Sequence, residues 1–167
     1  MSVFPVCCTA NVAISTIEKF LNEALAGSNK LAPGSEPALA IITATNELPT
    51  IASMPPLQPF TSPFIGQSVE EVSRQLNEAA HFAVLDERSM EDETVALVNR
   101  NSDRSVQTAR VTFDSAQSLL TALDVATLGF EEIRHIAASE GGVYGRNRES
   151  PKRGRPAPRV RLGGDKS

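Results

Sequence analysis

The sequence has only two cysteines, Cys7 and Cys8, and they are adjacent. Adjacent cysteines cannot cross-link distant parts of a chain, so a secreted fold held by disulfides is excluded. No apolar run approaches the ~18 residues that cross a membrane, and we expect no membrane partner. The apolar start of the chain is not preceded by Lys or Arg, as a signal peptide would be, and it favours a first strand. We therefore expect an intracellular protein.

Motifs for catalysis and for metal binding are also missing. His81 and His135 are the only histidines, and neither has a neighbour at metal-ligand spacing. The chain has no Gly-x-Ser-x-Gly nucleophile motif, no Gly-x-x-x-x-Gly-Lys phosphate loop and no Gly-x-Gly-x-x-Gly after the first strand. The sequence therefore predicts no catalytic residues, no metal and no cofactor, and it favours a protein that is not an enzyme.

Cys7 and Cys8 lie where a predicted strand passes into a helix. Amide dipoles at a helix N-terminus can acidify a thiol, which is one way to make a reactive cysteine. No Cys-x-x-Cys motif and no phosphate-loop arginine accompany the pair, since position 14 is Ile14. We interpret the two thiols as small buried side chains, one on each face of the strand.

Charge is divided unequally along the chain. From Arg146 onward there are eight basic residues and two acidic ones, a net charge of +6, whereas residues 1–145 hold 8 basic and 18 acidic residues, a net charge of −10. An acidic body with a basic arm is typical of a tail that contacts an anionic partner or its own body.

The first part of the chain predicts a parallel strand–helix–strand unit. Val3–Cys8 is a short buried strand, and an amphipathic helix follows, which we expect Thr9 or Asn11 to cap and Gly27 to end. The buried face of that helix has helical spacing: Ile14, Ile17, Phe20, Leu21, Ala24 and Leu25. Residues 37–45 form a continuous apolar run typical of a strand buried on both faces.

The middle of the chain predicts a loop, a helix and a hairpin. Five prolines between residues 49 and 63 favour a surface loop. Ser68 and Glu71 form a capping box that opens a helix. Residues 81–86 and 94–99 are strands, and the acidic loop Glu87 to Glu93 between them indicates an antiparallel hairpin.

The last part of the folded region predicts one more strand and two helices. Val106 to Phe113 alternates as a strand does, with Val111 and Phe113 on one face. Asp114 and Gln117 are expected to cap the next helix. The apolar faces of these two helices are Leu119, Leu120 and Leu123, and then Phe130, Ile133 and Ile136. Gly141–Gly142 ends the second.

These elements predict an α/β (α+β) fold with a mixed five-stranded sheet and three or four helices over residues 1–146. Residues 147–167 are rich in Arg, Pro and Gly and are expected to be a basic, disordered tail.

Four segments of the chain resemble a family of small bacterial and fungal domains of unknown function. They are His81–Val98, Ala109–Phe113, Leu128–Ile133 and the closing Gly141–Gly145. The resemblance extends over about residues 3 to 146. It implies the fold and assigns no chemistry.

Five carboxylates crowd the hairpin loop: Asp86, Glu87, Glu91, Asp92 and Glu93. Such density could hold Mg²⁺ or Ca²⁺, but the alternating order of a calcium loop is missing. Like charges in a solvated turn explain the run most simply. Our functional hypothesis for it is an acidic patch that binds a basic protein partner, ahead of a metal site.

The tail carries the sharpest motif, because Arg153, Gly154, Arg155 and Pro156 resemble the core of an AT-hook. Gly and Pro keep such a backbone extended, so that the two arginines fit a narrow A·T minor groove. The residues expected to meet phosphates are Lys152, Arg159 and Arg161. Ala157 departs from the motif, which usually has a basic residue there. A nuclear-import signal or a plain solvated arm are the alternatives.

We therefore predict a non-catalytic binding module with an unknown protein partner. The alternative is a DNA-associated protein that contacts nucleic acid weakly through its tail. A cytoplasmic location fits the first, and a nuclear one fits the second.

Overall fold

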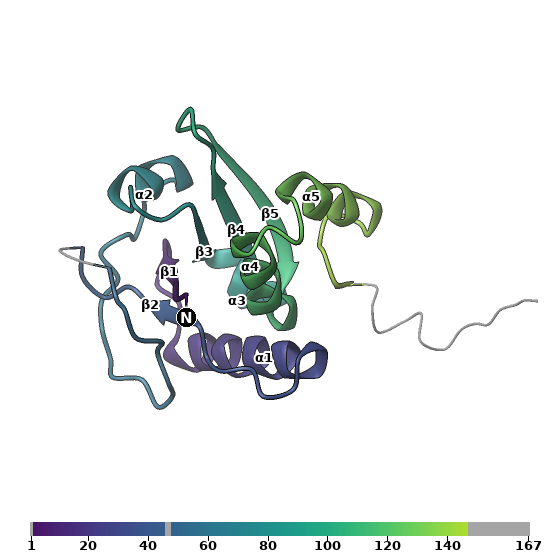
Figure 1. The fold of residues 1–167 in the computed structure, drawn as a ribbon. Helices are drawn as coiled ribbons and strands as arrows, with labels where there is room; N and C mark the ends of the chain where they lie inside the picture. The colour runs from purple at the N-terminus through teal and green to yellow at the C-terminus, as the bar shows by residue number, and fades with distance from the viewer. Residues whose placement is uncertain (1, 46–47, 147–167) are drawn as a thin grey trace, which may run out of the picture.

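The computed structural model describes residues 2–45 and 48–146, and it confirms the mixed five-stranded sheet (Figure 1). The strands in chain order are β1 (Phe4–Cys8), β2 (Leu39–Ile41), β3 (His81–Leu85), β4 (Thr94–Arg100) and β5 (Val106–Thr112). Their order across the sheet is β2-β1-β3-β4-β5. β1 is parallel to β2 and to β3, whereas β3, β4 and β5 are antiparallel neighbours. The predicted parallel unit and the predicted hairpin are both present.

More helices surround the sheet than the three or four expected. The helices of the described residues are α1 (Ile14–Leu31), α2 (Val69–Gln75), α3 (Glu87–Asp92), α4 (Ala116–Asp124), α5 (Phe130–Ser139) and a 3₁₀ turn, η1 (Phe113–Ser115). None of them is long and apolar enough to cross a membrane.

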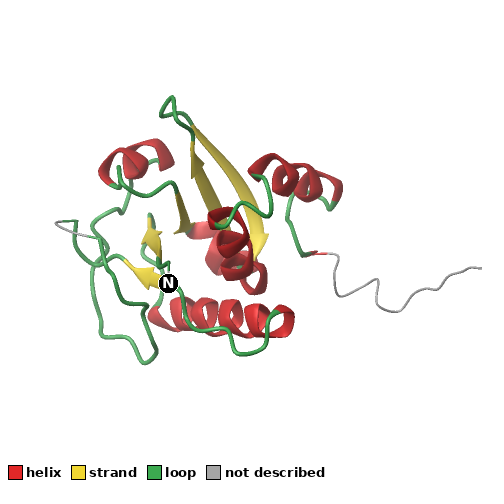
Figure 2. Cartoon of the chain, viewed as in Figure 1, coloured by secondary structure: helices red, strands yellow, loops and turns green. Residues whose placement is uncertain are grey.

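Each face of the sheet has its own apolar core. On one face the buried side chains of α1, α4 and α5, among them Phe20, Leu120 and Ile133, pack on the sheet. On the other face Val72 of α2 and Phe64 pack against Phe82. The segment 48–67 supplies Phe64, and it forms no helix or strand, as its prolines predict (Figure 2). Burial on both faces explains why β1 and β3 are apolar at nearly every position.

Helix α1 differs from the prediction at both of its ends. Its N-cap is Ala13, which makes no side-chain hydrogen bond, so neither Thr9 nor Asn11 caps it. The backbone N–H of Thr9 instead donates to Leu85 at 3.0 Å and so continues the pairing of β1 with β3. Gly27 does not end the helix, which runs on to Leu31. Its role is a close contact between elements, not helix termination.

The acidic segment between β3 and β4 is helical, and the predicted loop is wrong. The Asp86 carboxylate accepts from the Ser89 backbone N–H at 3.1 Å, and the Asp86 N–H donates to the Ser89 hydroxyl at 3.0 Å. This reciprocal cap nucleates α3. Glu93 then adopts a left-handed conformation with φ 59°, which ends α3 and returns the chain into β4.

The predicted Asp114–Gln117 capping box is also absent. Asp114 lies in η1, and its carboxylate accepts from the Thr112 hydroxyl at 2.6 Å. Gln117 is buried and reaches away from its own helix to the segment before β2. The Ser68–Glu71 capping box, by contrast, is confirmed, and two glycines with positive φ, Gly141 and Gly142, follow α5 as expected.

Candidate functional site

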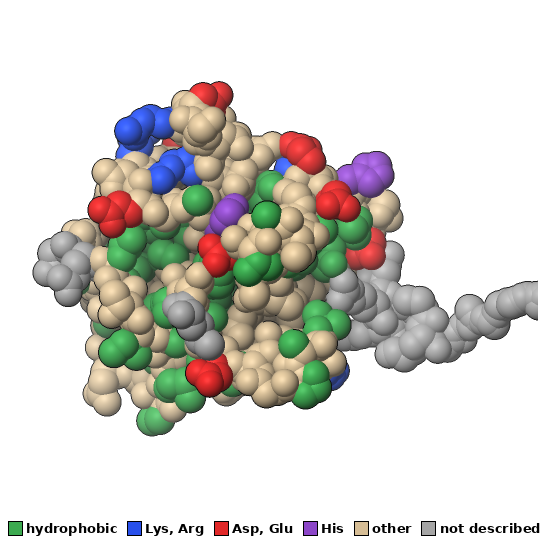
Figure 3. Space-filling view, in the orientation of Figure 1, with side chains coloured by type: hydrophobic (Ala, Val, Ile, Leu, Met, Phe, Trp, Pro, Cys, Tyr) green, Lys and Arg blue, Asp and Glu red, His purple; other side chains and the backbone are tan. Residues whose placement is uncertain are grey.

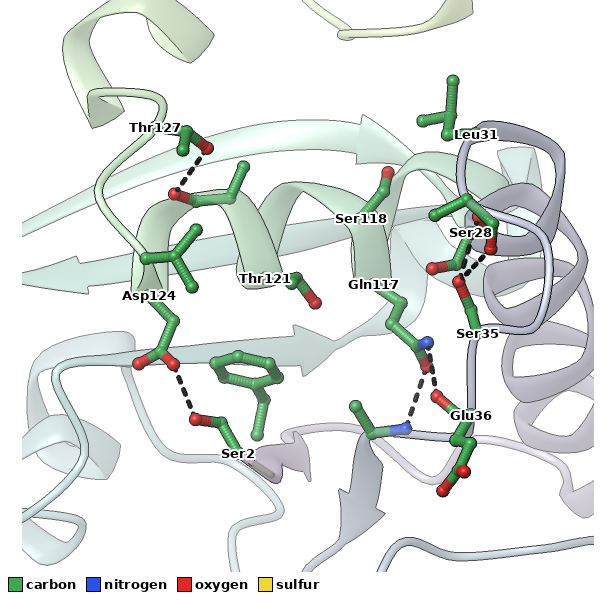
Figure 4. A pocket seen from close by; sticks show the side chains of 15 residues that line it. Ser2, Ser28, Leu31, Ser35, Glu36, Gln117, Ser118, Thr121, Asp124 and Thr127 are labelled. Atoms are coloured by element: carbon green, nitrogen blue, oxygen red, sulfur yellow. Dashed lines mark hydrogen bonds between the residues drawn. The ribbon is translucent and has the colours of Figure 1, made fainter.

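A large hollow in the described part of the molecule lies between α1 and α4 (Figure 4). We call it the α1–α4 cleft, with a volume of about 620 Å³. Its floor and walls include Phe4 of β1, Ala32 and Ala38 of the connecting segment, and Ala122 of α4. The lining is mainly apolar. A cavity of this size and character is typical of a small-molecule site, for which about 300 to 1,000 Å³ is usual.

Two long-range contacts hold the walls of the cleft in place. The Gln117 side chain accepts from the Ala38 N–H at 3.0 Å and donates to the Glu36 carbonyl at 3.0 Å. At the opposite end of α4, the Ser2 hydroxyl donates to the Asp124 carboxylate at 2.6 Å. Figure 4 shows both contacts facing the hollow, one at each end. The cleft is therefore shaped by polar contacts that leave its apolar surface uncovered.

One polar side chain in the lining is buried and unsatisfied. Ser28 of α1 is only 7% exposed, and its hydroxyl has no hydrogen-bond partner within residues 2–45 and 48–146. A buried hydroxyl without a partner costs about 1–3 kcal/mol, so native proteins rarely retain one without a reason. A bound molecule with a hydrogen-bonding group would satisfy it.

Each side of the rim of the cleft carries one large exposed apolar side chain. Leu31 at the end of α1 is 66% exposed, and Val125 at the end of α4 is 60% exposed. Both line the cleft. Large side chains exposed on opposite sides of one hollow extend its apolar surface outward and provide a contact area for a ligand.

The acidic residues singled out in the sequence do not form a free acidic patch. Asp86 and Arg110 make a two-point contact, at 2.7 and 3.1 Å. Glu93 accepts from Lys19 at 2.6 Å. Asp92 lies 2.7 Å from Arg88 and 3.5 Å from Arg146. Of the five carboxylates, only the exposed Glu87 and Glu91 lack such a contact among the described residues.

Burial and hydrogen bonding act on these carboxylates in opposite directions. Burial raises the pKa of Asp86, but the hydrogen bonds and charge of Arg110, with the hydrogen bonds from Ser89, outweigh it and hold the pKa below its usual value. The same balance lowers the pKa of Asp92, where Thr94 and Arg88 supply the hydrogen bonds. The described residues hold no group of three or more His, Cys, Asp or Glu side chains that could bind a metal ion.

Both cysteines are buried, as the sequence predicts, one in each core. Burial raises the pKa of Cys8 to about 12, and burial together with the neighbouring Cys8 raises the pKa of Cys7 further. A thiol is nucleophilic only as the thiolate. The strand–helix junction therefore does not produce an activated cysteine. The half-buried His81, whose pKa burial lowers, lies at the start of β3, away from both thiols in sequence.

The tail residues of the AT-hook prediction lie outside the described residues. They are Lys152, Arg153, Gly154, Arg155, Pro156, Arg159 and Arg161.

The cleft residues themselves escaped prediction from the sequence. Ser28, Gln117 and Val125 come from two helices far apart in the chain, and no motif joins them. The only local signal for the cleft was a large apolar residue at the end of each of the two helices, Leu31 for α1 and Val125 for α4.

The described residues define an α+β domain with a mixed five-stranded sheet and a mainly apolar cleft of ligand-binding size. Over residues 41–147 the chain matches a family described as a domain of unknown function (DUF6924), and it belongs to that family. The matched range starts at residue 41, later than the expected residue 3, so β1 and α1 lie outside it. Comparison with curated proteins and with solved structures found no match.

Proposed function

We propose that this domain is a non-catalytic binding module and that the α1–α4 cleft is its site. The ligand is a small, mostly apolar molecule with one hydrogen-bonding group. The observation that carries the proposal is the unpartnered hydroxyl of Ser28 in the lining of an apolar cleft of about 620 Å³. Apolar walls with a few placed polar groups are the usual composition of small-molecule sites.

The chemistry of the lining defines the ligand class. Phe4, Ala122 and the rim side chains Leu31 and Val125 would contact an apolar body. Ser28 would donate to, or accept from, a single polar group of the ligand. The Asp124 carboxylate accepts from the Ser2 hydroxyl at one end of the cleft, away from Ser28 (Figure 4).

The cleft is favoured over the acidic segment as the site of binding. Three of the five acidic side chains there already have cationic partners within the domain, which leaves Glu87 and Glu91 to attract a basic protein. A protein partner at α3 remains a proposal of its own, and it would depend on those two side chains.

Two related probes test the site directly. Naphthalene and naphthol have the same ring system, but only naphthol carries a hydroxyl. With the full chain we expect both to bind, and naphthol to bind about 3- to 10-fold more tightly through one hydrogen bond. Ser28→Ala should remove that difference and leave naphthalene binding unchanged. Fluorescence titration measures both affinities.

A cleft-filling variant provides the matched comparison. Ala122→Phe places a ring in the cleft and should abolish binding of both probes. Ala138→Phe makes the same change on the exposed face of α5 and should bind like the native chain. Equal binding by the two variants would overturn the proposal.

The second candidate function is association with DNA through the tail, and the sequence of Arg153–Pro156 alone supports it. That proposal does not involve the cleft, so either one can fail without the other.

A further inference from the structure

We propose that a second site, between α2 and the turn joining β4 to β5, binds a phosphate group. This α2–turn groove has a volume of about 420 Å³. Its lining includes Glu70, Ser73, Arg74, Arg100, Arg104 and Ser105. Three arginines against one glutamate give the groove a positive balance in a domain that is acidic as a whole. Figure 3 shows Lys and Arg side chains gathered at the upper left of the face it presents, beside this turn.

Arg100 has a structural role at the base of the groove. Its guanidinium donates to the carbonyls of Leu76 at 2.9 Å and of Ser73 at 3.3 Å, and also to that of Asn77. These carbonyls lie in the last turn of α2 and just beyond it, where a helix has unpaired acceptors. Arg100 thus ties α2 to β4 and keeps a cation at this position.

The other two arginines of the groove have no structural contact of this kind. Arg74 and Arg104 are exposed and make no side-chain hydrogen bond or ion pair with any residue described in the structure. Arg74 interacts electrostatically with Glu71 of its own helix, without an ion pair. Two guanidinium groups that line one groove without an ion pair to any described residue are available to an external anion.

The backbone around Arg104 holds this arginine in an unusual conformation. Its φ is +73°, a left-handed value that Gly and Asn adopt more readily than Arg. The turn is held by the Arg104 N–H to Asn101 carbonyl bond at 2.9 Å and by the Asn101 N–H to Ser105 carbonyl bond at 2.8 Å. The Asp103 carboxylate accepts from the Ser105 N–H at 3.0 Å, so its hydrogen bond is made within the turn. A strained arginine in a well-bonded turn is consistent with a functional position.

A phosphate monoester fits this charge and geometry best. The net charge of three arginines and Glu70 would be neutralised by a phosphate dianion. The planar guanidinium of arginine can also donate two parallel hydrogen bonds to phosphate oxygens. The Ser73 hydroxyl adds a neutral donor, whereas the Ser105 hydroxyl already donates to the Asp103 carboxylate. The groove is larger than a phosphate ion, which leaves space for the group esterified to it.

The test is a titration of the full chain with inorganic phosphate and, separately, with phosphoserine, followed by NMR of the arginine side-chain N–H signals. We expect saturable shifts of the Arg74 and Arg104 signals. Arg104→Asn keeps a residue that tolerates the left-handed backbone, and it should weaken binding by about 10-fold or more through loss of charged hydrogen bonds. Arg74→Gln should do the same from the helix side of the groove.

Arg134→Asn is the matched control, because Arg134 is an exposed arginine on α5 whose partner is Glu131. It should leave binding unchanged within twofold. Tighter binding of phosphoserine than of phosphate would identify a phosphate ester as the ligand, and equal binding would identify the free ion. Unchanged affinity in both groove variants, or shifts confined to the arginines of the tail, would overturn the proposal. The α1–α4 cleft shares no lining residue with this groove, so the two sites can be tested independently.

Discussion

Gly27 of α1 lies directly against the backbone of Asp114 in η1. A Cβ atom placed on Gly27 would be 1.9 Å from the Asp114 carbonyl oxygen and 2.8 Å from its carbonyl carbon. The same two elements also meet through Phe20 and Phe113, whose rings pack edge to face with centroids 5.1 Å apart. Glycine at position 27 therefore allows α1 to approach η1 this closely.

We expect Gly27→Ala to destabilise the domain by about 3 kcal/mol, because the clash is with backbone that cannot rotate away. Helix propensity alone would predict the opposite, a gain of about 1 kcal/mol. Urea unfolding followed by circular dichroism measures the change. Gly129→Ala is the control, since beyond its chain neighbours the nearest atom to the added Cβ would be the Glu132 carboxylate at 3.9 Å. A stabilised Gly27→Ala variant would contradict the close approach.

Ser28→Ala should stabilise the protein by about 1 kcal/mol, because it removes a buried hydroxyl that lacks a partner. Ser15→Ala, at an exposed position of the same helix, measures the part of the effect that comes from helix propensity. Thermal unfolding of the two variants beside the native chain gives the difference. A loss of stability in Ser28→Ala would show that the hydroxyl is satisfied in the free protein.

The Asp86–Arg110 contact should make stability depend on pH in the acid range. The pKa of Asp86 is lower in the folded state than in the unfolded state, so the unfolded chain takes up the proton first as the pH falls. Its contribution is complete at neutral pH, declines below about pH 5 and is lost once the pH passes below the folded-state pKa.

Asp86→Asn should therefore be about 1–2 kcal/mol less stable than the native chain at neutral pH, with little difference at about pH 2. Urea unfolding at a series of pH values measures this. Most of the lowering of the Asp92 pKa comes from Thr94 and Arg88 and is common to both chains, and Arg110 adds only the smallest part. A difference that stays constant across the series would exclude the ion pair as its source.

The two thiols should react slowly with an aromatic disulfide reagent while the domain is folded. With a pKa of about 12, the Cys8 thiol is almost entirely protonated at pH 8, and both cysteines are buried. Absorbance of the released thiolate counts the reacted groups, and the urea-unfolded chain should react at both. Rapid reaction of either thiol in the folded chain would revive the interpretation of a reactive cysteine.

Two double variants of the full chain test the predicted binding of DNA by the tail. Arg153→Gln with Arg155→Gln should remove any preference for A·T-rich over G·C-rich duplexes, since these two arginines are predicted to enter the minor groove. Arg159→Gln with Arg161→Gln should weaken binding to both duplexes alike and reduce the salt dependence by about two phosphate contacts. Equal affinity of the native chain for both duplexes would contradict the prediction that Arg153–Pro156 acts as an AT-hook.

The strands were readable from the sequence because their signals are local. The apolar runs Val3–Cys8 and Phe82–Leu85, and the alternation around Val111, follow from which faces of a strand are buried. The Ser68–Glu71 cap is likewise a contact within four residues. Two elements were assigned wrongly because a local pattern had a different role in the fold. Gly27 was predicted to end a helix, but it allows a tertiary contact. The acidic residues after Asp86 were predicted as a loop, but Asp86 caps a helix there.

By itself the sequence determined that a mixed five-stranded sheet forms, how charge is divided along the chain and that Cys7 and Cys8 are buried, since each follows from hydrophobic periodicity or from composition. The order of the strands came from the structure. Only the tertiary structure decided the two candidate sites. Gln117 binds the segment 79 residues before it, and Ser2 reaches Asp124 at a separation of 122 residues. Contacts over such distances leave no periodic trace in the chain, because they depend on how whole helices pack on the sheet.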